Sequence, residues 1–126
     1  MGLTVASATQ VSGASLSQNN GNLNFQNSPA FDNMSSLSVN GGELILQNGG
    51  TFDNSSVSFS ASVFNPAGEV SVTNGGSFNL DGTSSIVLEG DTTFSQSGDI
   101  YWPELNLDGN SLTPVSYTHL RAHETD

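Results

Sequence analysis

The sequence predicts an all-β fold, a parallel β-helix (solenoid) fragment of about five coils. An alternation of apolar and polar residues recurs along the chain, each copy turns at Asn or Gly, and no segment has the periodicity of a helix. Apolar residues two positions apart point to the same side of a strand. One copy is too small to bury that side alone, so neighbouring copies must stack and share a core.

The repeat is clearest at residues 41–52, and similar segments stand at residues 21–31, 68–78 and 84–94. Each has two apolar residues two positions apart, then Asn or Gly, then Phe four residues further on. Asn and Gly adopt the positive φ that such turns need. The first apolar residues, which set the alignment, are Leu23, Leu44, Val70 and Ile86, and a fifth copy begins at Leu105.

Stacking in this alignment predicts columns of like residues. We expect an internal aromatic ladder of Phe31, Phe52, Phe78 and Phe94. A polar ladder at one turn should contain Asn27, Asn48 and Asn74. A second strand of each coil should point inward with Leu37 and Val39, and in the next coil with Val57 and Phe59.

An antiparallel β-sandwich is the alternative, because several short strands joined by Gly and Asn turns are typical of that fold too. Hairpins, however, do not require the same residue type at the same place in every copy. The repeat therefore favours the solenoid.

The chain divides into three parts. Residues 1–20 form a degenerate first coil or a frayed start, and residues 21–114 form the β-solenoid repeats. Within the repeats, Phe64-Asn65-Pro66-Ala67 should bulge out as a loop, because a proline would interrupt a ladder. Residues 115–126 are interpreted as a non-native, disordered tail, since residues 115–125 resemble the translation of a transposon-end sequencing adapter at every position.

Composition excludes several kinds of function. The 126 residues carry a formal net charge of −11, and residues 1–114 contain no Lys, Arg, His or Cys. Nucleic-acid binding needs a basic patch, and direct membrane insertion needs a long apolar run, so neither is expected. A serine nucleophile needs a base, zinc needs His or Cys, and a phosphate loop needs Lys or Arg. We therefore expect no enzyme activity in this piece.

Carboxylates could still support one reaction. A glycoside hydrolase needs only two carboxyl groups at a suitable separation. Asp91, Asp99 and Glu104 fall within two adjacent coils and are the candidates for such a pair. We favour their interpretation as solvated turn residues.

Calcium is the one cofactor that the composition allows, because it takes oxygen ligands. Stacking should superpose Asp32, Asp53 and Asn79 just after each Phe, and these three are the candidate metal ligands. It should likewise superpose Glu43, Glu69 and Glu104 before a strand. Solvated columns without a metal are the favoured interpretation.

The segment Tyr101-Trp102-Pro103 departs from the repeat pattern and brings two aromatic residues together. Exposed apolar clusters often mark binding sites, so Tyr101 and Trp102 are the candidate ligand-binding residues, with a glycan as the ligand. The alternative is that they fill an irregular coil.

The repeats Gly-Glu-Leu-Ile-Leu-Gln-Asn-Gly-Gly-Thr-Phe (42–52) and Gly-Glu-Val-Ser-Val-Thr-Asn-Gly-Gly-Ser-Phe (68–78) resemble the autotransporter-associated β-strand repeats of large bacterial surface and secreted proteins. The resemblance covers residues 21–112 and implies a right-handed β-helix at the cell surface or outside the cell. We therefore expect a structural or adhesive shaft fragment, whose partners are neighbouring coils of the full-length chain and host or surface glycans or proteins. The alternatives are part of a β-helical glycoside hydrolase and a glycan-binding module.

Overall fold

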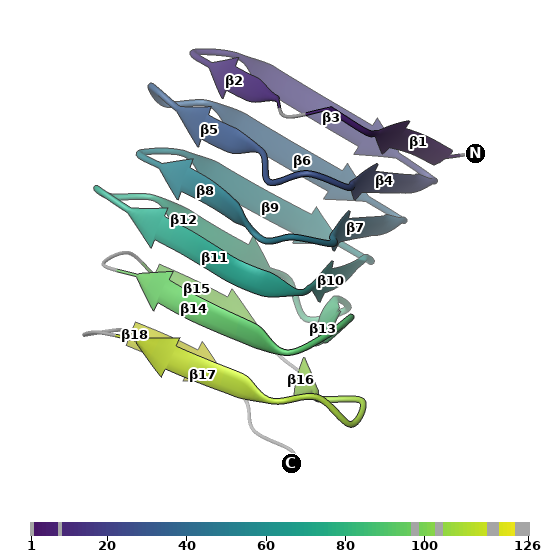
Figure 1. The fold of residues 1–126 in the computed structure, drawn as a ribbon. Helices are drawn as coiled ribbons and strands as arrows, with labels where there is room; N and C mark the ends of the chain where they lie inside the picture. The colour runs from purple at the N-terminus through teal and green to yellow at the C-terminus, as the bar shows by residue number, and fades with distance from the viewer. Residues whose placement is uncertain (1, 8, 97–98, 103–104, 116–118, 123–126) are drawn as a thin grey trace.

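The structure, a computed structural model, describes residues 2–7, 9–96, 99–102, 105–115 and 119–122. Its strands form three six-stranded sheets, and consecutive strands of the chain belong to different sheets. Three strands thus make one turn of a three-sided coil, and the turns wind right-handed down the stack (Figure 1). Every pair of neighbouring strands in the described residues is parallel. The predicted parallel β-helix is confirmed, and the antiparallel sandwich is excluded.

Each sheet is one side of the coil. Sheet A consists of β1 (Gly2–Val5), β4 (Asn22–Phe25), β7 (Glu43–Leu46), β10 (Val63–Pro66), β13 (Ser85–Val87) and β16 (Leu105–Asn106). Sheet B consists of β2 (Gln10–Ser12), β5 (Ala30–Asp32), β8 (Gly50–Asp53), β11 (Gly68–Thr73), β14 (Thr92–Gln96) and β17 (Leu112–Val115). Sheet C consists of β3 (Ser15–Asn19), β6 (Ser36–Asn40), β9 (Ser56–Ser60), β12 (Ser77–Leu80), β15 (Asp99–Trp102) and β18 (His119–Ala122).

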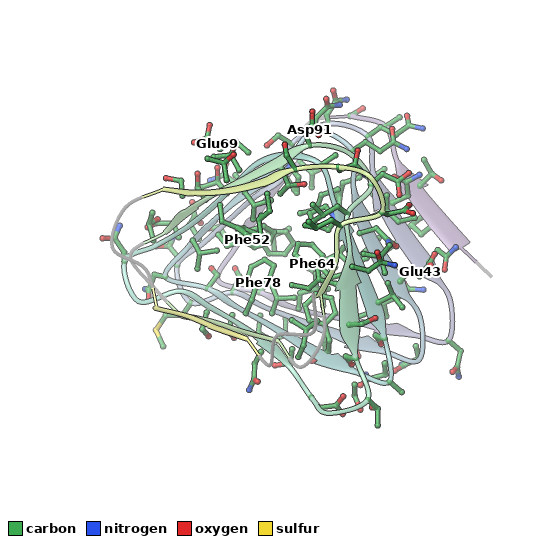
Figure 2. The ribbon with its side chains drawn as sticks, turned by 90° about the horizontal axis from the view of Figure 1, so that it is seen from below. Glu43, Phe52, Phe64, Glu69, Phe78 and Asp91 are labelled. Atoms are coloured by element: carbon green, nitrogen blue, oxygen red, sulfur yellow. The ribbon has the colours of Figure 1, made fainter. Side chains whose placement is uncertain are left out.

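Alternate residues of the strands fill the interior with a single apolar core. Phe64 of sheet A, Phe52 of sheet B and Phe78 of sheet C meet in its centre (Figure 2). The ring centroids of Phe52 and Phe78 lie 4.8 Å apart, and those of Phe64 and Phe78 lie 5.1 Å apart. Burying a side chain of this size contributes about 1.5–3 kcal/mol. The inward positions predicted for the second strand are confirmed, since its four apolar residues are buried: Leu37, Val39, Val57 and Phe59.

The predicted alignment of the repeats is wrong at one copy. In sheet A, Phe64 occupies the position that was predicted for Val70. The column consists of Leu23, Leu44, Phe64, Ile86 and Leu105. Val70 lies in sheet B, one side further round the coil. All three sides of the coil have the same alternation of apolar and polar residues and similar corners. The sequence of a strand-turn-strand segment on one side therefore resembles that of a segment on the next side.

The predicted aromatic ladder is correct only for its first two residues. Phe31 lies opposite Phe52 in sheet B, and the two rings stack with centroids 5.0 Å apart. Phe78 lies in sheet C, and Phe94 lies beside Val70 in sheet B. The interior therefore holds a cluster of Phe residues contributed by all three sheets in place of one continuous column.

The predicted asparagine ladder is divided between two corners. Asn27 and Asn48 occupy the corner between sheets A and B, where each side-chain amide donates to a carbonyl of the preceding coil. Asn74 lies at the corner between sheets B and C. There it follows Asn33 and Asn54 of the two preceding coils, and all three have positive φ.

The loop predicted at residues 64–67 is wrong, because Pro66 belongs to β10 and is buried. In a parallel pair, a residue that accepts through its carbonyl also donates its N–H to the same neighbour. The Pro66 carbonyl accepts from the Glu89 N–H, but proline has no N–H to give to Val87. The Asn65 side chain takes this role, donating through Nδ2 to the Val87 carbonyl at 2.9 Å.

The two ends of the chain also form strands. Residues 2–19 carry β1, β2 and β3, which stack on β4, β5 and β6 and leave Leu3 and Leu16 exposed. The tail expected to be disordered contains β18, which pairs with β15. An open sheet edge offers its backbone groups to any extended segment, whatever that segment's origin. Residues 116–118 and 123–126 lie outside the described residues, and the adapter origin of the tail stays a prediction.

We expect Asn65→Ala to lower the free energy of unfolding by about 1–3 kcal/mol, because the Val87 carbonyl loses its donor. Pro66→Ala supplies a backbone N–H, so the double variant Asn65→Ala/Pro66→Ala should recover about 1 kcal/mol of this loss. Urea unfolding of the four proteins measures the coupling. Asn24→Ala is the matched control, since Asn24 lies on the same outer face of sheet A and its Oδ1 has no hydrogen-bond partner. Purely additive effects of the two changes would contradict the replacement of the missing N–H by Asn65.

Candidate functional site

The backbone places two of the candidate catalytic carboxylates, Asp91 and Asp99, on either side of one strand. Asp91 precedes β14 and Asp99 follows it, and β14 has five residues. A strand of that length spans roughly 16 Å, which is longer than the separation of about 5–9.5 Å that glycosidases use. The Asp91 carboxylate also has a structural role, because its Oδ1 accepts the Ser111 N–H at 3.0 Å. Glu104 lies outside the described residues.

The candidate calcium ligands are not all brought together. Asp32 and Asp53 end neighbouring strands of sheet B, whereas Asn79 lies in β12 of sheet C. The superposition of Asn79 on the two aspartates is therefore wrong. Each aspartate has a hydrogen-bond donor nearby: Gln10 Nε2 lies 3.0 Å from Asp32 Oδ2, and Thr73 Oγ1 lies 2.9 Å from Asp53 Oδ1. These donors offset the repulsion between the stacked carboxylates.

The expected column of glutamates is also divided. Glu43 lies in sheet A and Glu69 in sheet B, and they point outward from different sides of the coil (Figure 2). Glu104 falls outside the described part. Within that part, no three His, Cys, Asp or Glu side chains are close enough to hold a metal ion. The same part contains no helix of sufficient length and apolar character to cross a membrane.

Asp81 stabilises the corner between sheets C and A. Its Oδ1 accepts from the Thr83 N–H at 3.0 Å, from Thr83 Oγ1 at 2.8 Å and from Ser84 Oγ at 2.9 Å. The hydrogen bonds from Thr83 and then Ser84 lower the pKa of Asp81 to about 2 from 3.8. The buried Ser84 hydroxyl in turn accepts the Ser62 N–H at 3.0 Å. The lowered pKa thus results from a capped turn, which has a structural role.

The Asp81 carboxylate should make stability depend on pH. A folded-state pKa of about 2 against 3.8 means that its contribution is complete above pH 3.8 and lost as the pH falls toward 2. We expect wild type to be more stable than Asp81→Asn at pH 6, and the difference to shrink through this window. Thermal unfolding at a series of pH values measures it. A difference that stays constant down to pH 2 would show that the charged form has no special role.

Tyr101 and Trp102, the candidate ligand-binding residues, belong to the regular strand β15. In the register of sheet C, Tyr101 lies opposite Asn79 and Trp102 lies opposite Ala122. The backbone here continues the stack, which differs from the irregular coil considered as the alternative. The side chains of both residues lie outside the described part of the structure.

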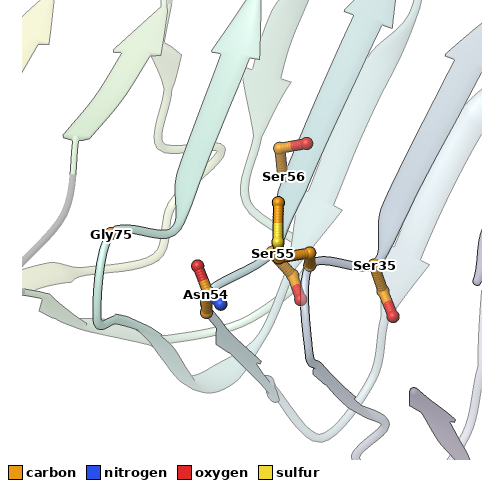
Figure 3. A pocket seen from close by; sticks show the side chains of 6 residues that line it. Ser35, Asn54, Ser55, Ser56 and Gly75 are labelled. Atoms are coloured by element: carbon orange, nitrogen blue, oxygen red, sulfur yellow. The ribbon is translucent and has the colours of Figure 1, made fainter. Parts of the chain in front are cut away.

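An open hollow of about 200 Å³ lies at the corner between sheets B and C (Figure 3). It is lined by uncharged residues of two neighbouring coils and of the next corner: Met34, Ser35, Asn54, Ser55, Ser56 and Gly75. The Ser35 hydroxyl donates to the Asp32 carbonyl at 2.7 Å, and the Ser55 hydroxyl donates to the Asp53 carbonyl at 3.1 Å. Because both hydroxyls use their single donor on the backbone, the hollow offers an uncharged ligand mainly a contact surface.

Met34 is the unusual residue of this hollow. Its side chain is 79 % exposed, and its φ is 62°. Two coils further along the stack, Gly75 occupies the position of Met34 in the same corner, and its φ is 84°. The left-handed conformation costs a non-glycine residue about 1–2 kcal/mol, and such strain often marks a functional position. The sequence signal was a single large apolar residue between Asn33 and Ser35, and the repeat alignment did not single it out.

We expect Met34→Gly to raise the free energy of unfolding by about 0.5–1 kcal/mol, because glycine removes the strain at a smaller entropic cost. Met34→Ala keeps a Cβ at the same φ and should leave stability nearly unchanged. Comparing the urea midpoints of the two variants separates backbone strain from loss of the side chain. An equal gain in both variants would mean that the exposed methionine side chain, and not its φ, destabilises the corner.

No protein-family model matches this chain, and neither the curated proteins nor the solved structures contain a match. Any assignment of function therefore depends on the sequence pattern and on the geometry described above.

Proposed function

We propose that this chain is part of the shaft of a secreted or cell-surface bacterial repeat protein, with a structural or adhesive role and no catalysis in this piece. The observation that carries the proposal is the continuity of the three sheets along the stack (Figure 1). Each coil is hydrogen-bonded to the next on all three sides. A load along the axis is therefore shared among three ladders.

Hydrogen bonds outside the backbone ladders support the same role. They connect residues 20 to 22 positions apart in the sequence, which is one coil. Asn40 Nδ2 donates to Asn19 Oδ1 at 3.0 Å, and the Gly42 N–H donates to the Ser62 hydroxyl at 3.2 Å. Each coil is thus attached to its neighbours at the corners as well as along the strands.

The resemblance to autotransporter-associated repeats supports the bacterial and extracellular part of the proposal. Such repeats imply a β-helix that projects from the cell or is released. An enzymatic role receives no comparable support, because β14 separates Asp91 from Asp99 and the Asp91 carboxylate accepts a backbone N–H. Partners of the shaft are then further coils at its ends and molecules that contact its outer faces.

The shaft proposal can be tested by whether the exposed end of the stack associates with other molecules of the protein. Within the described residues, the outer edges of β1, β2 and β3 pair with no strand, and Leu3 and Leu16 are 53 % and 39 % exposed there. If further coils continue the stack, this end should attract other strands. We expect light scattering and small-angle X-ray scattering to show elongated oligomers that grow with protein concentration.

Two matched double variants each add two negative charges, one at the exposed end of the stack and the other on its side. Leu3→Glu/Leu16→Glu should shift the protein toward monomers, because each charge would be buried in the contact. Met34→Glu/Thr51→Glu adds the same charge on the side of the stack and should leave the oligomers unchanged. A monomer at every concentration in wild type would count against the shaft. Release of reducing ends from polysaccharides would instead favour the glycoside hydrolase.

A further inference from the structure

The outer face of sheet C is uniform in chemistry. At the outward positions of β3, β6, β9 and β12, every side chain is Ser or Asn, while the inward positions of β6, β9 and β12 are apolar and buried. We call the surface formed by the outward side chains of these four strands the serine-asparagine face. Its residues are Ser15, Ser17, Asn19, Ser36, Ser38, Asn40, Ser56, Ser58, Ser60, Ser77 and Asn79. Its columns are in register from coil to coil, so like groups recur about every 4.8 Å along the stack and about every 6.6 Å along a strand.

The other two sides differ from this face in charge. The outer face of sheet B carries Asp32, Asp53 and Glu69, and that of sheet A carries Glu43. In a chain with a net charge of −11, the outward positions of β3, β6, β9 and β12 carry no carboxylate, and the carboxylates Asp81 and Asp99 come only after β12 in the chain. A partner can therefore contact the middle of the serine-asparagine face without desolvating an anion.

Hydrogen-bonding capacity on the face is used only in part by neighbouring coils. Ser36 Oγ donates to Ser15 Oγ at 3.1 Å, and Asn40 Nδ2 donates to Asn19 Oδ1 at 3.0 Å. A hydroxyl has one donor and two acceptor sites, and an amide has two donors and an acceptor oxygen. Each column therefore retains both donors and acceptors that point to the outside, which suits a partner rich in hydroxyl groups.

The hollow described above adjoins this face. Ser56 is both a member of the face and part of the lining of the hollow, and Met34 stands at the same corner. An exposed methionine gives an adaptable apolar contact beside a polar array. The hollow and the face thus adjoin, with one exposed apolar side chain, that of Met34, at their common corner.

We propose that the serine-asparagine face, with the Met34 hollow at its edge, binds an uncharged, extended polysaccharide chain. A straight array of columns in register fits a flat chain with a regular repeat, and hydroxyl groups match the donors and acceptors of Ser and Asn. An anionic polysaccharide is repelled by the net charge of the protein. The inference deepens the proposed adhesive role and depends on it, since it names the class of molecule to which the shaft adheres.

The register also sets the limit of this face. Sheet C continues with β15, where Asp99 lies opposite Ser77 and Tyr101 lies opposite Asn79. The serine-asparagine face is therefore limited to the four strands β3, β6, β9 and β12.

The test is depletion of the protein from solution by insoluble cellulose and by chitin, with cross-linked polygalacturonate as the anionic probe. We expect wild type to bind one or both neutral polymers, and 0.5 M salt to leave this binding unchanged. Ser38→Asp/Ser58→Asp places two carboxylates in the centre of the face and should weaken binding about tenfold or more. Ser71→Asp/Ser95→Asp is the matched control, with two neighbouring serines on the outer face of sheet B, and should bind like wild type.

Three results would overturn the proposal: no depletion of wild type by either neutral polymer, equal losses in both aspartate pairs, or binding to polygalacturonate alone. Self-association through the face would also overturn it. In that case light scattering would detect dimers. The Ser38→Asp/Ser58→Asp variant would abolish these dimers, and the Leu3→Glu/Leu16→Glu variant would not. Circular dichroism confirms that both aspartate variants are folded. Failure to bind glycans would leave the end-to-end oligomers, and with them the shaft proposal, standing.

Discussion

The backbone ladder between successive coils is the constraint on which the rest of the structure depends. After three short strands and three corners, the chain must return in register with the preceding coil. The corners of successive coils therefore approach one another as closely as neighbouring strands of a sheet do. At some corners this leaves no room for a side chain: a Cβ added at Gly42 would lie 1.8 Å from the Gly21 carbonyl oxygen, and one at Gly49 would lie 2.0 Å from that of Glu69. Glycine there is required by contact between backbones.

The same constraint separates the inside of the coil from its outside. Inward positions share a narrow core, and Phe52, Phe64 and Phe78 fill it from three sides. Outward positions need only be compatible with their neighbours one coil away. Where those neighbours are both acidic, as at Asp32 and Asp53, donors from adjacent residues offset the repulsion. Elsewhere Ser and Asn are sufficient, which explains how so polar a chain forms a regular fold.

Alternation, Asn-Gly turns and the recurring Phe were enough to predict a parallel β-helix and the inward residues of its strands. Register was harder to predict, because a three-sided coil repeats the same pattern on each side and similarity between segments does not say which side they occupy. Val70 was misplaced for this reason. Pro66 was misplaced because no propensity rule anticipates that the side chain of Asn65 supplies the missing donor. The serine-asparagine face was visible as Ser-x-Ser-x-Asn at residues 15–19 and 36–40, but only the register places these segments side by side.

A shaft that is held together by its backbone leaves its outer side chains free to serve another purpose. Carboxylates gather on sheets A and B and at corners, while the outward side chains of β3, β6, β9 and β12 carry none. Stability alone does not require this difference, because all three sheets are paired in the same way. Solubility does not require it either, since charge spread over three sides would serve as well. A contact surface for an uncharged partner does require a face without charge, such as the outward positions of these four strands, and the strained Met34 stands at its edge.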